Sequence, residues 1–232
     1  MLYITGDTHG DWREFEQRMH PYKLTADDIL IVTGDFGFSM DKWTAINWIK
    51  MDRSYTTLFC DGNHENFDVL DSLPLVSRYG DLVSRFDENT FRLLTGHMYT
   101  LEGIKTFVFG GASSIDKDWR VDPDIVKVHG KLWWQQEVPT KESVDCARRV
   151  LEENGWCFDL FISHTTRPDF RRRILEDMSV ESFYDPVEDL ILSLEQEIEF
   201  HGGSWQASYF GHLHRDVDIG RRHCLYHRVL KV

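Results

Sequence analysis

The stretch that decides the fold is Leu2-Tyr3-Ile4-Thr5-Gly6-Asp7-Thr8-His9-Gly10, in which a short apolar run changes abruptly to small, acidic and imidazole residues. The same order returns in Ile29-Leu30-Ile31-Val32-Thr33-Gly34-Asp35 and in Leu58-Phe59-Cys60-Asp61-Gly62-Asn63-His64. Short apolar runs bounded by turn residues are typical of strands that are buried on both faces. Each stretch therefore predicts a buried strand with polar side chains at its carboxyl end.

The segments between these runs have the spacing of amphipathic helices. Their apolar positions are Trp12, Phe15 and Met19 in the first segment and Trp43, Ile46 and Ile49 in the second. Three later runs repeat the strand pattern, at residues 106–109, 160–163 and 207–210. Strands that alternate with helices predict an α/β fold.

Residues 91–109 alternate tightly around a Thr95-Gly96 turn and leave no room for a helix, which predicts a β-hairpin that joins the sheet antiparallel. Two longer helices are expected later in the chain. One begins at Thr140 and ends before Gly155, and the other begins at Pro186, after the cap Asp185, and ends at Gly202-Gly203.

The chain has 232 residues, which at about 100–200 residues per domain predicts a single domain over residues 1–232. The sequence contains no internal repeat and no linker-like tract. Within this domain, residues 165–204 are the best candidate for a cap-like insertion.

Composition narrows the classes of partner. The 26 lysine and arginine residues face 39 aspartate and glutamate residues, which gives a formal net charge of −13. Such a surface repels phosphates and anionic lipids, so we expect no membrane association and no general binding of duplex nucleic acid. The sequence begins without a basic leader and has no apolar run of the ~18–20 residues that a membrane span needs. Four scattered cysteines indicate reduced thiols, so we expect a cytoplasmic protein.

The strand ends carry the chemistry, because ligands of open α/β sheets bind outside the carboxyl ends of the strands. These ends supply two carboxylates, one amide and five imidazoles: Asp7, His9, Asp35, Asn63, His64, His164, His212 and His214. Oxygen and imidazole ligands together suit Mn, Fe, Zn or Ni better than calcium or a thiolate site. Eight groups are too many for one ion, which favours two metal ions bridged by Asp35. Such pairs, ~3.5–4 Å apart, activate a water for phosphoryl displacement.

Five motif blocks in this order resemble the calcineurin-like metallophosphoesterase superfamily. They are Gly-Asp-x-His at 6–9, Gly-Asp-x-Gly at 34–37, Gly-Asn-His-Glu at 62–65, His164 after a strand, and Gly-His-x-His at 211–214. A single block has little specificity, whereas five ordered blocks are specific. Residues 110–120 also resemble a segment of bacterial and phage-associated members. The resemblance implies two mixed β-sheets packed face to face and flanked by helices, a four-layer sandwich.

The resemblance also implies a role for each residue. One metal would be held by Asp7, His9 and His214, the other by Asn63, His164 and His212, and Asp35 would bridge them. The nucleophile would be the hydroxide between the two metals. His64 would face the substrate and assist the leaving group, which suits an imidazole of near-neutral pKa.

The chain departs from the protein Ser/Thr phosphatases of this superfamily. These carry an arginine shortly after the second block, where this chain reads Gly34-Asp35-Phe36-Gly37-Phe38, and another where it has Asp61. Phe38 also replaces an aspartate that orients the histidine matched by His64. The departures disfavour a protein phosphatase and leave open which residue orients His64.

Residues outside the blocks have alternative interpretations. Arg120 could supply the missing positive charge for a substrate phosphate through bidentate contacts. The Arg171-Arg172-Arg173 run could line the mouth of the site or belong to a solvated helical face. Trp133-Trp134 could stack a nucleobase, or belong to the core or to a dimer surface.

The sequence thus predicts a divalent-metal-dependent phosphoesterase that hydrolyses a phosphodiester or phosphomonoester of small size, such as a nucleotide. One alternative is a nuclease or cyclic-nucleotide phosphodiesterase, which uses the same chemistry. Another is a metal-stabilised binding or regulatory module without turnover. An intact His64 beside seven intact ligands disfavours the module, because a scaffold needs the metals but not the proton donor.

Overall fold

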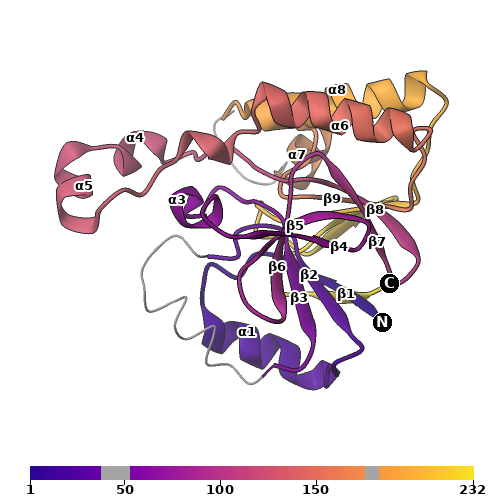
Figure 1. Ribbon diagram of the computed structural model, residues 1–232. Helices are drawn as coiled ribbons and strands as arrows, with labels where there is room; N and C mark the ends of the chain where they lie inside the picture. Colours follow the sequence, from indigo (N-terminus) through magenta and orange to yellow (C-terminus); the bar gives the residue numbers. More distant parts are fainter. Residues whose placement is uncertain (38–52, 176–182) are drawn as a thin grey trace.

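The computed structural model describes residues 1–37, 53–175 and 183–232 of the protein. Within these ranges, two mixed sheets of seven and six strands lie face to face, and helices cover their outer faces (Figure 1). The predicted sandwich of two mixed sheets is therefore confirmed. No helix of the described ranges is long and apolar enough to cross a membrane.

The seven-stranded sheet carries the first three motif blocks. In spatial order its strands are β13 (Val229–Lys231), β1 (Leu2–Thr5), β2 (Ile29–Val32), β3 (Thr56–Phe59), β6 (Thr90–Leu93), β5 (Asp81–Arg85) and β4 (Leu75–Arg78). Strands β1, β2 and β3 are parallel, with Tyr3 opposite Leu30 and Leu30 opposite Thr57. Their carboxyl ends consequently lie at one edge.

The six-stranded sheet carries the last two blocks. Its strands are, in spatial order, β11 (Val217–Ile219), β12 (Arg222–Cys224), β10 (Ala207–Phe210), β9 (Leu160–Ser163), β8 (Ile104–Phe109) and β7 (His97–Leu101). Strands β8, β9 and β10 are parallel, so the residues after β9 and β10 also share one edge.

The strands are apolar on both faces because both faces are buried. Along β2, Ile29 and Ile31 pack into the layer between the two sheets, whereas Leu30 and Val32 face the opposite layer with Phe15. Strand β8 behaves in the same way: Val108 lies between the sheets, and its neighbours face α6 and α8. This period of two is the reason that short runs without polar residues form strands here.

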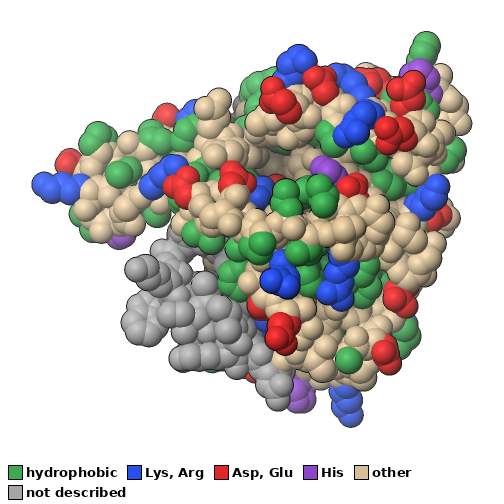
Figure 2. All heavy atoms as spheres, viewed as in Figure 1, with side chains coloured by type: hydrophobic (Ala, Val, Ile, Leu, Met, Phe, Trp, Pro, Cys, Tyr) green, Lys and Arg blue, Asp and Glu red, His purple; other side chains and the backbone are tan. Residues whose placement is uncertain are grey.

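Helices complete the outer layers. The seven-stranded sheet is covered by α1 (Trp12–Met19). Asp11 caps this helix, because its carboxylate accepts hydrogen bonds from the backbone N–H groups of Arg13 and Glu14. The six-stranded sheet is covered by α6 (Lys141–Glu153) and α8 (Pro186–Phe200). Asp185 caps α8 as predicted, and Thr140, the predicted start of the other helix, caps α6. Acidic and basic side chains mix over their outward faces, as Figure 2 shows.

The other helices of the described residues are η1 (His20–Tyr22), α3 (Phe67–Leu70), α4 (Lys117–Arg120), α5 (Pro123–His129), η2 (Gln135–Glu137) and α7 (Pro168–Leu175). Residues 115–130, which include α4 and α5 and are called the arm below, extend away from the sandwich (Figure 1). Apolar side chains are exposed along the arm, including Ile115 at 67% and Val128 at 75%.

Residues 91–109 contain an antiparallel hairpin, as predicted, but its turn is not the one at Thr95-Gly96. Strand β6 pairs with β3 and β5 in one sheet, while β7 pairs with β8 in the other, so the chain changes sheet at Thr95-Gly96. The tight turn that the sequence indicates is real, but the two strands that it joins pair with different partner strands. The hairpin of this region lies one turn later, between β7 and β8.

Two other expectations have a different outcome. The helix expected around Trp43, Ile46 and Ile49 lies outside the described residues, and so does Phe38. The proposed insertion at 165–204 contains α7 and α8, and the apolar side of α8 packs on the six-stranded sheet through Ile191. The division of the chain into a domain and a cap stays a prediction.

Candidate metal centre

The predicted ligands meet where the two sheets present the carboxyl ends of their parallel strands. Asp7 and His9 follow β1, Asp35 follows β2, Asn63 and His64 follow β3, His164 follows β9, and His212 and His214 follow β10. Residues from both sheets thus share one site, although the sequence separates the first block from the last by about two hundred positions.

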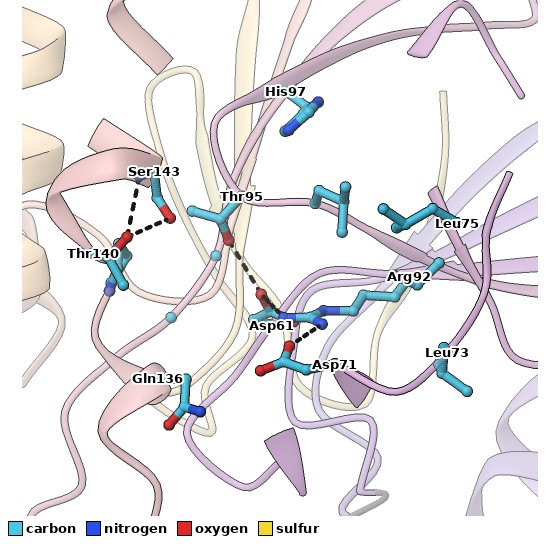
Figure 3. A pocket seen from close by; sticks show the side chains of 15 residues that line it. Asp61, Asp71, Leu73, Leu75, Arg92, Thr95, His97, Gln136, Thr140 and Ser143 are labelled. Atoms are coloured by element: carbon cyan, nitrogen blue, oxygen red, sulfur yellow. Dashed lines mark hydrogen bonds and ion pairs between the residues drawn. The ribbon is translucent and has the colours of Figure 1, made fainter. Parts of the chain in front are cut away.

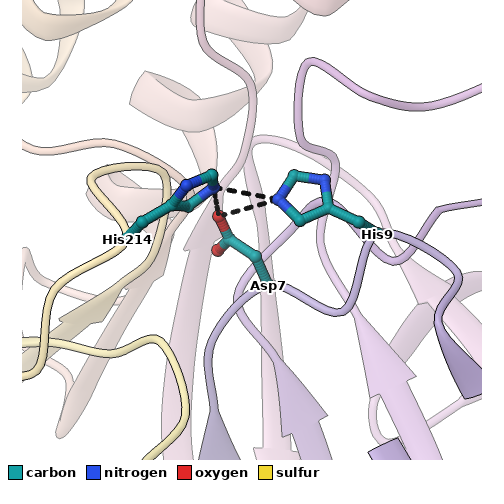
Figure 4. A group of neighbouring side chains, drawn as sticks. All are labelled: Asp7, His9 and His214. Carbon is teal, nitrogen blue, oxygen red and sulfur yellow. Dashed lines mark hydrogen bonds and ion pairs between the residues drawn. The ribbon is translucent and has the colours of Figure 1, made fainter. Parts of the chain in front are cut away.

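The first group of ligand atoms joins the two ends of the chain. The Nε2 atoms of His9 and His214 lie 2.9 Å apart, and Asp7 Oδ2 lies 3.1 Å from His214 Nε2 and 3.8 Å from His9 Nε2 (Figure 4). These three residues are one of the sets whose ligand atoms all lie within 4.8 Å of one another. They are also the set predicted to hold one metal.

The second group surrounds His164, which is fully buried. Its Nε2 atom lies 3.3 Å from Asp35 Oδ1 and 3.1 Å from Asn63 Oδ1. Its Nδ1 atom donates to the backbone oxygen of Thr33 at 2.8 Å, because a carbonyl oxygen only accepts. That hydrogen bond leaves Nε2 as the ligand atom, as is usual for metal-binding histidines.

A cleft of about 470 Å³ opens at this edge, lined by Asp35, Asn63, His64, His212 and His214 among the site residues. The His212 ring packs edge-on against His164, with centroids 5.0 Å apart, and its backbone N–H donates to Asp7 at 3.1 Å. The site is therefore walled by protein on one side and open to a small molecule on the other.

The loops that carry the ligands have unusual backbone conformations. His9, Asp35, His212 and His214 all have positive φ angles, between 47° and 64°. Such angles are uncommon for residues with a side chain and concentrate at functional sites. At Gly211 a Cβ atom would collide with the Asp7 carboxylate, which explains why the block needs glycine there.

Comparison with known proteins agrees with this geometry. The sequence profile of the calcineurin-like phosphoesterases matches residues 2–216, a span that contains all eight site residues. The chain belongs to this family. No curated protein matches its sequence.

The charges of this phosphoesterase fit divalent cations at the site. Burial alone would raise the pKa of Asp35, but His164, together with His64 and His9, outweighs burial and holds that pKa well below its usual range. Although burial opposes it, the same attraction from Asp35 raises the pKa of His164 to about 10. The buried carboxylates therefore stabilise a positive charge at His164. Divalent cations can replace that proton, because metal ligands bind in their deprotonated forms.

The two other ligand sets show how closely the groups converge. One contains Asp7, Asp35 and His164, and the other contains His9, Asp35 and His64. Asp35 belongs to both, which agrees with its predicted place between two metals. His64 is predicted to face the substrate, and the structure places its ring edge-on to His9 with centroids 5.0 Å apart. The individual roles of these residues stay predictions.

Several supporting residues of the phosphoesterase site were not predicted. Asn63 Nδ2 donates to Ser114 Oγ at 3.2 Å, and Ser114 Oγ donates to Glu137 at 2.6 Å, so the Asn63 amide oxygen points toward His164. Arg18 donates to the backbone oxygens of Gly6 and Asp7 at 3.1 and 3.0 Å. Because these contacts join distant parts of the chain, local sequence patterns carry no signal for them.

Glu65, the last residue of the third block, has a supporting position as well. Its side chain is fully buried and accepts hydrogen bonds from the backbone N–H groups of Phe36 at 2.7 Å and Gly37 at 3.3 Å. Burial raises the pKa of this carboxyl to about 8. Glu65 thus holds the loop that begins at Asp35.

Arg120 lies against His64 rather than in the cleft. The guanidinium donates from Nη1 to the backbone oxygen of Asn63 at 3.1 Å, and Nη2 lies 2.7 Å from His64 Nε2. Its Nε atom pairs with Asp116 at 2.8 Å, and the residue is only 6% exposed. The substrate contact expected of Arg120 stays a prediction. Among the described residues, the arginines that line the cleft are Arg171 and Arg215.

The two tryptophans lie next to this support. Trp134 is 4% exposed. Trp133 donates from Nε1 to Glu137 at 2.7 Å, while Lys117 Nζ lies 4.1 Å from its ring centroid. Lys131 Nζ lies 5.0 Å from the Trp134 ring centroid, and neither tryptophan is among the described residues that line the cleft.

Asp61, where protein phosphatases have an arginine, points into a different cavity of about 400 Å³ (Figure 3). Arg92 donates to both Asp61 carboxylate oxygens, at 2.6 and 3.0 Å, and to Asp71 at 2.9 Å. Thr95 donates to the same Asp61 carboxylate at 3.3 Å. The charges of this cavity are therefore paired within the protein.

Proposed function

We propose that this phosphoesterase hydrolyses a phosphomonoester or a phosphodiester with the help of two divalent metal ions. The observation that carries the proposal is the position of Asp35. Its Oδ2 atom lies 3.7 Å from His9 Nδ1 and its Oδ1 atom 3.3 Å from His164 Nε2, so one carboxylate faces both groups of ligands.

The proposal divides the ligands between two ions. One ion would be held by Asp7, His9 and His214, the other by Asn63, His164 and His212, with Asp35 shared between them. Mn, Fe, Zn and Ni all suit this set. When bound, the ions neutralise phosphoryl charge and lower the pKa of the attacking water.

His64 would donate a proton to the leaving oxygen. Its backbone N–H donates to Asp35 Oδ1 at 2.8 Å, which fixes the start of the side chain. Arg120 Nη2 lies 2.7 Å from Nε2 and 3.1 Å from Nδ1 of His64, and because an arginine only donates hydrogen bonds, this contact favours a neutral ring with a nitrogen that can accept. A neutral imidazole keeps one N–H, and this is the proton that His64 would donate to the leaving group.

Arg120 is on this account the positioning residue for His64. Its neighbouring charge adds to the effect of burial, and together they lower the pKa of His64, although Asp35 opposes them. A neutral, oriented imidazole results, in a chain that lacks the orienting aspartate of the protein phosphatases.

The remaining expectations fit the same proposal. The substrate is a small phosphorylated compound, since the cleft holds about 470 Å³ and the chain carries a net charge of −13. All four cysteines are free thiols, which supports a cytoplasmic location.

The test is hydrolysis of p-nitrophenyl phosphate and bis(p-nitrophenyl) phosphate across a titration of Mn, Fe, Zn and Ni, together with metal analysis. We expect turnover with about two ions per chain, and loss of turnover in Asp35→Asn and His64→Ala. The control is Asp71→Asn, the same change as Asp35→Asn in the paired cavity.

The ester preference then separates the alternatives. Faster hydrolysis of the diester would favour a nuclease or cyclic-nucleotide phosphodiesterase. Bound metal without hydrolysis of either ester would contradict the proposal and favour a binding or regulatory module.

A further inference from the structure

The cleft at the metal centre adjoins a second cavity. This cavity, of about 360 Å³, is lined by residues of α7, by the start of α8 and by the residues that precede α8. Three residues line both hollows: Arg171, Leu175 and Phe183. The site residues after the strands line only the first. The shared wall thus lies where a molecule that starts at the metals and extends outward would next make contact.

Arg171 is held in place at this wall. Its Nη1 atom donates to the backbone oxygen of Phe183 at 2.8 Å, and its Nε atom lies 3.3 Å from Glu188 Oε1. The side chain is 13% exposed. These contacts fix the guanidinium before any ligand arrives, so little side-chain entropy is lost when it binds an anion.

The partner of Arg171 leaves much of its charge uncompensated. Burial raises the pKa of Glu188 to about 8, so near neutral pH this carboxyl is largely protonated. Asp35 and Asp116 line the cleft, and the whole chain is acidic. A substrate with additional negative charge therefore needs a local cation, and a fixed arginine is the side chain best suited to a phosphate.

Apolar side chains lie beside this arginine. Leu175 and Phe183 share its wall, and Ile115 and Leu213 also line the cleft. A compound that fits must consequently offer an apolar surface as well as charge.

We propose that Arg171 binds a second phosphate of the substrate, and that the substrate is a small phosphoester with an apolar ring and two phosphates, as in a doubly phosphorylated nucleotide. This inference rests on the proposed function, because the first phosphate is the one at the metals. It assigns a role to one arginine of the Arg171-Arg172-Arg173 run.

The experiment compares the binding of three probes by calorimetry: adenosine 5′-monophosphate, adenosine 5′-diphosphate and adenosine 3′,5′-bisphosphate. The protein is loaded with Mn²⁺, and hydrolysis of p-nitrophenyl phosphate is measured separately. The two doubly phosphorylated probes place the second phosphate at different distances. We expect at least one of them to bind about tenfold more tightly than the monophosphate.

Variants assign that preference to one side chain. Arg171→Gln should abolish it, and Arg171→Lys should retain part of it. The matched control is Arg173→Gln, which removes the same charge from the same helix at a residue that lines neither hollow. Chelation of Mn²⁺ by the second phosphate would affect all variants equally. Because Arg171→Gln leaves Glu188 without its partner, Arg171→Gln/Glu188→Gln provides a version without a buried carboxylate.

Equal binding of all three probes by the wild type would overturn the inference, and so would a preference that persists in Arg171→Gln and in the double variant. The separate assay keeps the two proposals distinct. Hydrolysis of p-nitrophenyl phosphate without any preference for two phosphates removes the role of Arg171 alone, whereas binding without hydrolysis removes the proposed function.

Discussion

Two polar regions diverge from the residues that follow β3. Asn63 and His64 line the cleft at the metal centre, while Asp61, two residues earlier, turns into the cavity that it shares with Arg92 (Figure 3). In the Asp61 cavity, each carboxylate faces an arginine donor. At the metal centre, imidazole nitrogens face each other and carboxylate oxygens at 2.9 to 3.8 Å.

This difference distinguishes charges that are paired within the protein and stabilise the fold from charges that are arranged to bind a ligand. An arginine paired with two carboxylates satisfies its hydrogen bonds and needs no ligand. Converging acceptor atoms repel one another unless a proton or a cation lies between them. The volumes of the two hollows are similar, so the arrangement of the donors, and not the size of the cavity, identifies the site of chemistry.

The largest expected effect is on activity, at the residue shared by both ligand groups. Asp35→Asn should lower kcat/KM by on the order of 10³-fold, because it removes a charge that the reaction needs throughout. Metal analysis should show fewer than two ions per chain. The matched change in the other region, Asp71→Asn, should keep both the metal content and the activity. Equal losses in the two variants would break the distinction between the regions.

The next effect is on stability and lies in the Asp61 cavity. Arg92→Met leaves the Asp61 carboxylate buried without its partner and should lower the free energy of unfolding by about 3–5 kcal/mol. Urea denaturation in the presence of a chelator measures this loss. Asp61→Asn/Arg92→Met should recover most of it. If the single variant instead loses its metal ions while its stability is unchanged, the cavity belongs to the functional site.

A smaller effect is expected at Arg120, which touches the metal centre without lining the cleft. Arg120→Met should lower kcat by about 10–100-fold, as is typical when a supporting residue of a site is lost. The loss should be greater for phenyl phosphate than for p-nitrophenyl phosphate, since the poorer leaving group depends more on a proton donor. Equal losses for the two esters would mean that Arg120 acts only on stability.

The smallest effect concerns Glu188, which is intermediate between the two regions. It is buried, which favours its protonated form, and it pairs with Arg171, which favours its charged form. Its pKa in the folded protein, about 8, is above the ordinary value of 4.5, although Arg171 and Arg172 lower it while Asp185 and Asp189 raise it. The stability from its protonated form is complete below pH 4.5 and is lost as the pH rises through 8. Glu188→Gln should therefore flatten the decline of Tm over that interval. Parallel Tm profiles would show that Glu188 titrates normally.

Much of the site was predictable because the strand ends bring their polar residues to one edge. Gly6-Asp7, Gly34-Asp35 and Gly211-His212 mark these ends in the sequence, and the parallel order of the strands does the rest. The sequence did not indicate that Arg120 contacts His64, or that Ser114 donates a hydrogen bond to Glu137. Such contacts depend on how the arm and η2 pack against the loop after β3, and no local pattern encodes that packing.

The fold shows the same limit. Buried runs such as Ile29–Val32 were predictable because both faces are apolar. Strand β4 was missed because Leu75 is 58% exposed and its neighbours are largely exposed too. The turn at Thr95-Gly96 was predictable, but the partners of the two strands that it joins were not. A turn specifies where the chain reverses, and not the strand beside which each flanking strand lies.

Arg120 joins the arm to the residues that follow β3 at the metal centre. It is the last residue of α4, a part of this projecting element, and its guanidinium contacts Asn63 and His64. This connection offers protein engineering a way to change the rate of hydrolysis from a distant site. We expect a synthetic binder selected against the exposed face of the arm around Val128, or a crosslink that anchors α5, to shift the His64 ring without touching a predicted metal ligand.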